Sequence, residues 1–562
     1  MPLLKFLSVS PAQCRAFVAT TCVITLGLAA NCADDDDDDD DAHEHGDDDH
    51  GDGDGDGDGD GDGDGDGDGD GDGDGDGDGD GDGDGDGDTG MGTDTGTETG
   101  TGTGSGSDTG TGTDEPPDHY AFESRFVEGS SVSYGGQIFR HVLIGDLKSH
   151  LGGLTARVDD ASFIPAAGEV VAELNFYLQF DSATSGTLPH SITTDPAVLQ
   201  ADYDAIGTDK DLQGKVAGND PVGQHKDWTI EFGGWSADDA TTPEGLVLHW
   251  FAEVERLAID RSQGTIPNDP DGMPIASVHV SADGRDYQQL IQKFLDGAVG
   301  FSQAADDYLD DTEDGKGLLS DNTAAVEDKP YSALEHNWDE GYGYFGAARD
   351  YLEYTDEEIA KKGGREDYQG YHDTDGDGSI DLLSEYHFGH SINAAKRDLG
   401  AAEAAPTDFT QQAMDAFLAG RHLITTADGA LDETQAAELG TLRDTAILTW
   451  EKAISATIVH YINDVLQDMN KFGTEDYNFL DHAKHWSELK GFALALQFNP
   501  RSPVTDEQFV EFHQKVGDAP VLPGQEGIDE YKATLVEVRA LLGTAYEFDA
   551  ANLGDENGEN GW

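Results

Sequence analysis

The sequence predicts an all-α protein with two pseudo-repeated helical bundle halves, preceded by a disordered acidic tether. Three observations predict this organisation. Apolar residues recur at helical spacing through most of residues 118–545, segments with strand-like alternation are few, and an unbroken Gly-Asp repeat occupies residues 51–88. The first half of the helical domain is expected at about 118–354 and the second at about 355–545.

The composition is strongly acidic. Among 562 residues, 117 Asp and Glu stand against 31 Lys and Arg, which gives a formal net charge of −86. This charge excludes a nucleic-acid binder that works through a basic surface, and it fits an exported protein that meets salt or divalent cations. The three cysteines all lie within residues 1–32. The folded part therefore contains no disulfide, thiolate metal site or cysteine nucleophile.

Residues 1–32 have the features of a lipoprotein-type signal peptide. Lys5 and Arg15 precede an apolar run, residues 16–30. This run is too short to span a bilayer. The run ends at Cys32 in a sequence that resembles a bacterial lipobox, so we expect cleavage before Cys32 and its lipidation. Plain signal-peptidase cleavage is the alternative. We expect an exported lipoprotein, anchored by lipid to the outer membrane and facing the periplasm or the cell surface.

Residues 33–117 predict a disordered tether rich in Asp, Gly and Thr. Residues 34–115 hold 36 acids and no Lys or Arg, including eight consecutive Asp and nineteen Gly-Asp dipeptides. Such a segment has too little apolar surface to form a core. The alternative function for it is weak binding of divalent cations.

Each predicted helix is a stretch whose apolar residues lie three or four apart. In the first half these stretches are 137–151, 170–180, 245–259, 287–308 and 333–351. In the second half they are 380–399, 409–424, 446–469, 483–498, 509–516 and 528–542. Residues 228–232 suggest a short hairpin, and residues 546–562 are expected to form a flexible tail.

The pattern Trp-x-Glu-x-x-Gly-aromatic occurs twice in the predicted helical domain. It begins at Trp338 in the first half and at Trp486 in the second. With only seven tryptophans in the chain, this echo favours two halves related by a pseudo-twofold axis, each of which supplies one such helix.

Each of these helices also pairs a histidine with a glutamate. On an α-helix His336 shares a face with Glu340, and His485 shares a face with Glu488. An imidazole and a carboxylate so placed can bind one cation, as in the Glu-x-x-His pairs of di-iron bundles. The four residues are thus candidate ligands for iron or another transition metal. The alternative is that each pair forms ordinary hydrogen bonds in the core.

Residues 373–385 follow the pattern of an EF-hand calcium loop. Acidic side chains stand at positions 1, 3, 5 and 9, with Gly378 at position 6 and Ile380 at position 8. Position 12 is Ser384, and the glutamate falls one residue later. We expect a single structural calcium loop outside an EF-hand pair; an acidic turn is the alternative. Its predicted ligands are Asp373, Asp375, Asp377, Ser379 through its carbonyl, Asp381 and Glu385.

Segments 334–346 and 485–500, with the shorter segment 417–421, resemble an uncharacterised family of bacterial envelope lipoproteins, domain of unknown function 4856. The resemblance covers residues 118–545. More distantly, the His485-x-x-Glu488 helix is similar to that of imelysin-like proteins, although Ala483 stands where their motif has glycine. That likeness implies a fold of two bundle halves, iron as the metal, and an envelope uptake system as the partner.

Three functions remain open at this point. The first is a cell-envelope lipoprotein that binds a metal or metal complex, accessory to iron uptake and without catalysis; it predicts that Glu340 and Glu488 converge on one polar site. The second is a metal-dependent hydrolase of the peptidase type, which needs an open coordination position beside a general base. The third is a non-catalytic surface or structural protein.

Overall fold

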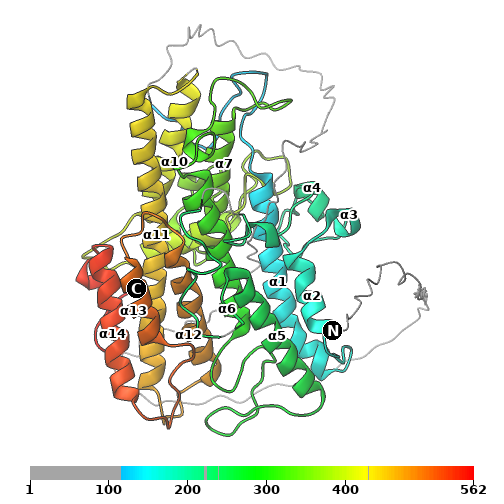
Figure 1. Ribbon diagram of the computed structural model, residues 1–562, viewed down its shortest axis with the longest axis vertical. Coiled ribbons are helices and arrows are strands. Elements are labelled where there is room, and N and C mark those ends of the chain that lie inside the picture. The colour runs from blue at the N-terminus through cyan, green and yellow to red at the C-terminus, as the bar shows by residue number, and fades with distance from the viewer. Residues whose placement is uncertain (1–114, 221–223, 238, 428) are drawn as a thin grey trace, which may run out of the picture. The chain divides into compact units, whose positions relative to one another are not determined.

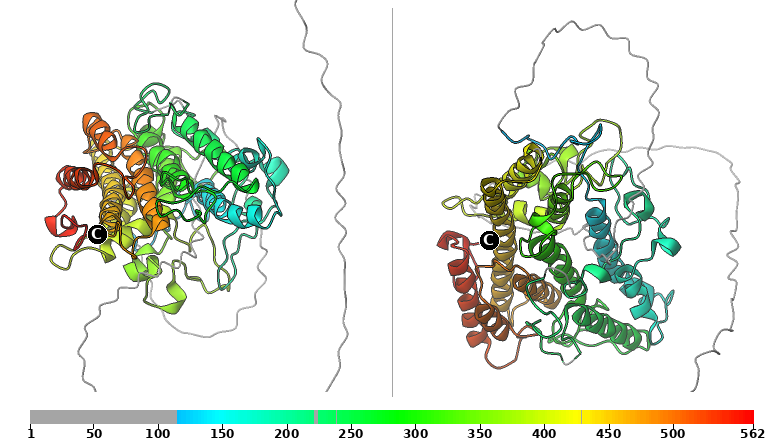
Figure 2. Two further views of the ribbon diagram at one scale, coloured as in Figure 1. Left: turned by 90° about the horizontal axis from the view of Figure 1, so that it is seen from below. Right: turned by 45° about the horizontal axis from the view of Figure 1, so that its top comes forward.

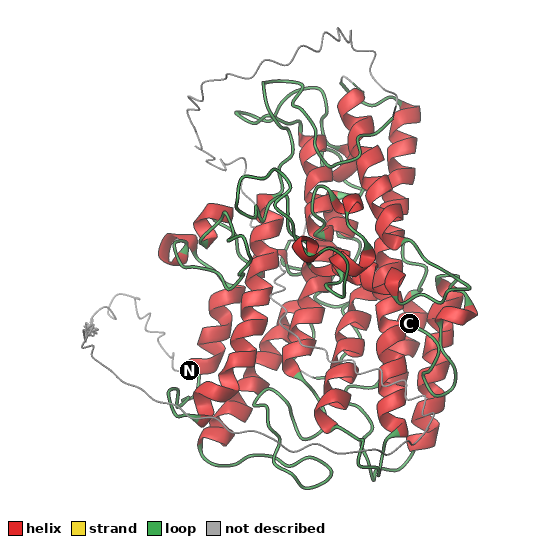
Figure 3. Ribbon diagram, turned by 180° about the vertical axis from the view of Figure 1, so that it is seen from behind, coloured by secondary structure: helices red, strands yellow, loops and turns green. Residues whose placement is uncertain are grey.

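The computed structural model describes residues 115–562 except 221–223, 238 and 428. The predicted signal peptide, the predicted lipidation site Cys32 and nearly all of the predicted tether lie outside the described residues. The described residues contain helices and isolated β-bridges but no β-sheet (Figure 3). The predicted all-α class is confirmed. Within this part of the chain, no helix combines the length and the apolar character needed to cross a bilayer.

Each predicted stretch overlaps an α-helix of the structure. Their bounds are α1 (Gly135–Asp159), α2 (Glu169–Leu178), α3 (Ser182–Ser185), α4 (Tyr203–Ile206), α5 (Pro243–Ser262), α6 (Tyr287–Leu295), α7 (Ala333–Phe345), α8 (Asp356–Ile359), α9 (Gly389–Leu399), α10 (Phe409–Thr426), α11 (Glu433–Asn470), α12 (Phe479–Leu494), α13 (Asp506–Val516) and α14 (Ile528–Ala545). The π-helices are η2 (Asp296–Phe301) and η3 (Ala304–Tyr308). The 3-10 turns are η1 (Gln213–Lys215), η4 (Gly317–Leu319), η5 (Tyr351–Glu353), η6 (Glu366–Tyr368), η7 (Ala495–Gln497) and η8 (Ala550–Asn552).

The helices form two groups joined by α6 and α7. One group contains α1, α2 and α5, which pack against one another. In the other, the 38-residue α11 packs against α9, α10, α12 and α14. Between the groups, α6 contacts both α1 and α12, while α7 contacts both α1 and α10 (Figures 1 and 2). A large apolar core runs through both groups, with Trp250, Trp338 and Trp450 fully buried.

Several helix boundaries differ from the sequence prediction. The helix α1 continues eight residues past 151, to Asp159, and α11 begins thirteen residues before 446, at Glu433. The stretch 287–308 starts as α6 but continues as the π-helices η2 and η3. The stretch 333–351 ends as a helix at Phe345 because Gly346 is left-handed, with φ 81°. The stretch 380–399 becomes helical only at Gly389, because Ile380 is held in a β-bridge with Val198.

Two further segments differ as well. Residues 228–232 form turns instead of a hairpin, and the amides of Ile230 and Glu231 both donate to the Asp227 carbonyl. Residues 546–562, expected to be flexible, are packed onto the helices. Trp562 is 5% exposed; its indole donates to the Arg397 carbonyl at 2.9 Å, and its carbonyl accepts from Asn463 at 2.8 Å. Burial of an aromatic ring therefore fixes this segment.

Gly420 on α10 provides a test of the packing between α10 and α7. A Cβ there would lie 1.9 Å from Trp338 Cζ2, and the Trp338 indole donates to the Phe417 carbonyl at 2.9 Å. Gly420→Ala is thus expected to lower the free energy of unfolding by about 1–3 kcal/mol, measured by urea denaturation. Gly440→Ala on α11 is the control, because its nearest contact is a flexible Arg443 nitrogen at 3.9 Å. Equal stability of the two variants would contradict this account.

Candidate metal sites

The first candidate site is the loop 373–385, between η6 and α9. Carboxylate oxygens of Asp373, Asp375 and Asp377 lie within 4.8 Å of one another, and this is the one such group of three or more His, Cys, Asp or Glu side chains among the described residues. Gly376 and Gly378 have φ values of 72° and 89°, which only glycine adopts easily. These two glycines let the backbone curl around the three carboxylates.

Backbone amides of the loop hold these carboxylates in place. The Gly378 amide donates to Asp373 Oδ2 at 2.9 Å, and the Asp377 amide donates to Asp375 Oδ1 at 3.0 Å. The Ser379 amide donates to Asp377 Oδ1 at 2.8 Å. Asp373 Oδ1 is buried and accepts no hydrogen bond within the described part of the chain. Asp373 Oδ1, at position 1 of the loop, thus lacks the hydrogen-bond donor that a buried acceptor usually has.

Glu385, one residue after position 12, is turned into the loop. Its Oε1 accepts from the amides of Thr374 at 2.8 Å and Asp375 at 3.3 Å, and its Oε2 accepts from the Asp381 amide at 2.8 Å. Burial raises the pKa of Glu385 above its usual range. Ser384 instead donates through Oγ to Asp381 Oδ2 at 2.7 Å. The glutamate and not the serine therefore closes the loop.

A short backbone pairing anchors the loop to the helical domain. The Ile380 amide donates to the Ala197 carbonyl at 3.0 Å, and the Leu199 amide donates to the Ile380 carbonyl at 2.8 Å. Asp381 Oδ1 also accepts from Gln200 Nε2 at 2.7 Å. In a paired EF-hand, position 8 contacts a second loop. Here segment 197–200 takes that place.

The pair on α7 is occupied by contacts to α1 and to residues just before α1 and α7. Glu340 Oε1 accepts from Gln137 Nε2 at 3.0 Å and lies 3.7 Å from His336 Nε2. His336 Nδ1 lies 3.1 Å from the Ser133 carbonyl, and its ring stacks on Tyr331. Contacts of this kind match the alternative in which His336 and Glu340 form ordinary hydrogen bonds.

The pair on α12 faces α6 and α11. His485 Nδ1 lies 2.7 Å from Asp468 Oδ2, and Glu488 Oε1 lies 3.7 Å from Lys293 Nζ. Burial acts to lower the pKa of His485. The hydrogen bond to Asp468 and the negative charge of Asp464 outweigh burial and raise that pKa to about 9. Glu488 Oε2 is buried without a hydrogen-bond partner among the described residues.

The contacts of Glu340 and Glu488 share no residue, so they give no sign of the single polar site that the sequence predicted. The glycines one turn later explain why. A Cβ at Gly343 would lie 2.7 Å from Tyr134 Cβ, and one at Gly491 would lie 2.7 Å from Lys293 Cβ. Each Trp-x-Glu helix thus uses its glycine to pack closely on a different helix.

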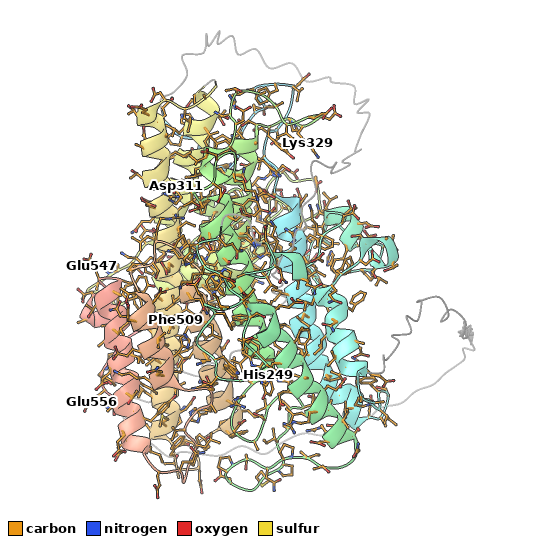
Figure 4. The ribbon with its side chains drawn as sticks, in the orientation of Figure 1. His249, Asp311, Lys329, Phe509, Glu547 and Glu556 are labelled. Atoms are coloured by element: carbon orange, nitrogen blue, oxygen red, sulfur yellow. The ribbon has the colours of Figure 1, made fainter. Side chains whose placement is uncertain are left out.

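His249 and Glu253 lie one turn apart on α5 but contact different residues. His249, labelled in Figure 4, contacts Asp239 at 3.0 Å, while Glu253 contacts Arg256 at 3.0 Å. His249 and Glu253 therefore belong to two separate pairs at the protein surface.

Sequence reasoning missed a cluster on α11 next to the α12 pair. His460 Nε2 lies 3.3 Å from Asp464 Oδ2, and the Tyr461 ring stacks on His485 with centroids 6.3 Å apart. Burial raises the pKa of Asp464 to about 6 and lowers the pKa of His460 well below its usual range. The signal in the sequence was the i, i+4 spacing of His460 and Asp464 within the predicted helix 446–469.

The described residues thus form an all-α domain with a loop on which three carboxylates converge and a half-buried cluster of histidine and carboxylate side chains. Residues 240–375 match the family described as Domain of unknown function (DUF4856). The match runs from the start of α5 to the first carboxylates of the loop, and it confirms the resemblance to that family over these residues. Neither the curated proteins nor the solved structures contain a match to the chain.

Proposed function

We propose that this chain is a lipid-anchored protein of the cell envelope that binds metal ions, with Ca²⁺ in the loop 373–385 and a transition metal such as iron elsewhere in the helical domain, in support of an envelope uptake system. The observation that carries the proposal is the convergence of the Asp373, Asp375 and Asp377 carboxylates within 4.8 Å. Oxygens that share one Ca²⁺ at about 2.4 Å each lie at most about 4.8 Å apart.

The chemistry of the loop also fits calcium. Its donors are all oxygens, which a hard cation prefers, and the unpartnered Asp373 Oδ1 offers a further ligand position. When bound, Ca²⁺ would neutralise carboxylates that otherwise repel one another. The residues that would hold it are Asp373, Asp375, Asp377, Ser379 by its carbonyl, Asp381 and Glu385.

Calcium is expected to raise the thermal midpoint of the full chain. A ligand at one hundred times its Kd adds about 2.7 kcal/mol to the free energy of unfolding, and Asp375→Asn should remove this gain. Differential scanning calorimetry with CaCl2 and with a chelator measures it. Asp271→Asn, in another exposed Asp-Gly turn, is the matched control. The acidic residues 34–115 are common to all variants, so a gain that persists in Asp375→Asn would overturn the calcium site.

The second candidate function is a non-catalytic surface protein. The separate placement of Glu340 and Glu488 favours it, because that reading expects each glutamate to be held by its own neighbours. Elemental analysis of the purified chain after exposure to calcium and to iron separates the two functions. Calcium without any transition metal would support the structural role.

A further inference from the structure

A cavity of about 330 Å³ lies between the start of α10, the middle of α11 and the segment that follows α14. It is partly open to solvent, and it shares no lining residue with the loop 373–385. Cavities that bind small organic molecules begin at about this size and combine apolar walls with a few polar groups. The lining of this cavity has both features.

Four aromatic side chains form one wall of the cavity. The ring centroids of Phe409 and Trp562 lie 6.2 Å apart. The Phe548 centroid lies 4.8 Å from that of Trp562 and 5.6 Å from that of Tyr546. The four rings thus contact one another in series. An aromatic group of a ligand that entered the cavity would exchange water for contact with these rings, which is favourable.

Hydrogen bonds hold the aromatic wall in place. The Trp562 indole donates to the Arg397 carbonyl at 2.9 Å. Asn552, which is 1% exposed, donates through Nδ2 to the Ala405 carbonyl at 2.8 Å. Its Oδ1 accepts from the Ala402 amide at 2.7 Å. The wall is therefore preorganised, which lowers the free-energy cost of binding a ligand.

Charged groups of both signs line the same cavity. The Lys452 ammonium forms no ion pair or hydrogen bond with any residue that the structure describes, although the chain has 117 acids against 31 Lys and Arg. The exposed Glu547 carboxylate, labelled in Figure 4, also has no partner in the described part of the chain. Asp549 uses one oxygen to accept from the Ala551 amide at 2.9 Å. One cation and one carboxylate can thus each pair with a charge on a ligand.

We infer that this cavity binds a free α-amino acid with an aromatic side chain. The side chain of the ligand would lie against the aromatic wall, its carboxylate would pair with Lys452, and its ammonium would pair with Glu547. A purely anionic ligand would be repelled by Glu547 and Asp549, and a purely cationic one by Lys452, so the lining favours a zwitterion. This site is independent of the proposed metal-binding function.

Calorimetric titration of the full chain with L-phenylalanine, L-tyrosine and L-tryptophan tests the inference. We expect at least one of the three to bind. Two analogues of the tightest binder are then compared: the amine that lacks its carboxylate and the carboxylic acid that lacks its ammonium. Each should bind about 10–100-fold more weakly, because one charged hydrogen bond is lost. If none of the three amino acids bound, or if either analogue bound as tightly as the amino acid, the inference would be overturned.

Two variants test the assigned contacts from the side of the protein. Lys452→Gln should weaken binding of the amino acid about 10–100-fold. Lys532→Gln on α14 is the matched control, because Lys532 lies outside the cavity and donates to Asn470. Glu547→Gln should weaken binding of the amino acid but not that of the carboxylic acid analogue. Thermal unfolding without ligand checks that each variant folds. Unchanged affinity for the amino acid in both Lys452→Gln and Glu547→Gln would refute the site.

Discussion

Arg421→Gln is expected to lower the free energy of unfolding by about 3–5 kcal/mol. Arg421 on α10 is fully buried and donates to Asp339 Oδ1 at 2.7 Å and to Glu335 Oε1 at 3.1 Å, both on α7. It also donates to Ser131 Oγ at 2.7 Å and to Thr425 Oγ1. Loss of the guanidinium would leave two carboxylates in the core without their main cation.

The protonation behaviour of these carboxylates shows how much they depend on Arg421. Burial raises the pKa of Asp339, and it acts to raise the pKa of Glu335 as well. For Glu335 the charge of Arg421, with bonds from Ser332 and Arg125, outweighs burial and holds the pKa below its usual range. Without Arg421, less positive charge would offset the cost of burying the Asp339 and Glu335 carboxylates.

Urea denaturation of Arg421→Gln beside Arg256→Gln makes this comparison. Arg256 also pairs with two carboxylates, Glu253 at 3.0 Å and Asp260 at 3.2 Å, but its side chain is 51% exposed. Its replacement should cost at most about 1 kcal/mol. If both variants lost the same stability, the buried network would have no special role.

Glu451→Gln is expected to stabilise the protein at pH 8 by about 3 kcal/mol and to have little effect at pH 5. Glu451 on α11 is fully buried, accepts from Asn499 at 2.7 Å, and has no hydrogen-bond partner at Oε1 among the described residues. Burial raises its pKa from 4.5 to about 7.

The sign follows from proton binding. Between pH 4.5 and about 7 the folded state keeps a proton on Glu451 that the unfolded state has lost, so stability falls as the pH rises through this range. Glutamine stays neutral and avoids this loss. Urea denaturation at pH 5 and pH 8 measures the difference, with the exposed Glu433→Gln on the same helix as control. A difference between wild type and Glu451→Gln that does not change with pH would refute the account.

The sequence was sufficient to locate the main helices, though not their ends, because their apolar spacing reflects one continuous core. It also located the loop on which Asp373, Asp375 and Asp377 converge, since that pattern is local and ends within thirteen residues. The position of Glu385 and the start of α9 were harder, because both depend on the bridge between Ile380 and Val198, a contact across the chain.

The partners of the buried polar groups could not be predicted from the sequence, because they too lie far apart along the chain. Arg421 meets Ser131, which is 290 residues away, and the Trp562 indole donates to the Arg397 carbonyl, which is 165 residues away. No spacing rule links such partners. Periodicity places a residue on a face of its helix, but only the packing of the helices decides which charges meet there.

The π-helices η2 and η3 lie in a segment whose backbone carbonyls bind other parts of the chain. A π-turn disrupts the regular i to i+4 ladder, and in this segment main-chain carbonyls accept from other parts of the chain. The pairs are Asp296 with the His390 ring at 3.3 Å, Ala298 with the Ala217 amide at 2.8 Å, Ala305 with Arg501 at 2.5 Å and Leu309 with Arg443 at 2.7 Å. The acceptors in this segment are backbone carbonyls, so these hydrogen bonds do not use its side chains. A one-residue deletion that restored regular winding would therefore remove several of these contacts together.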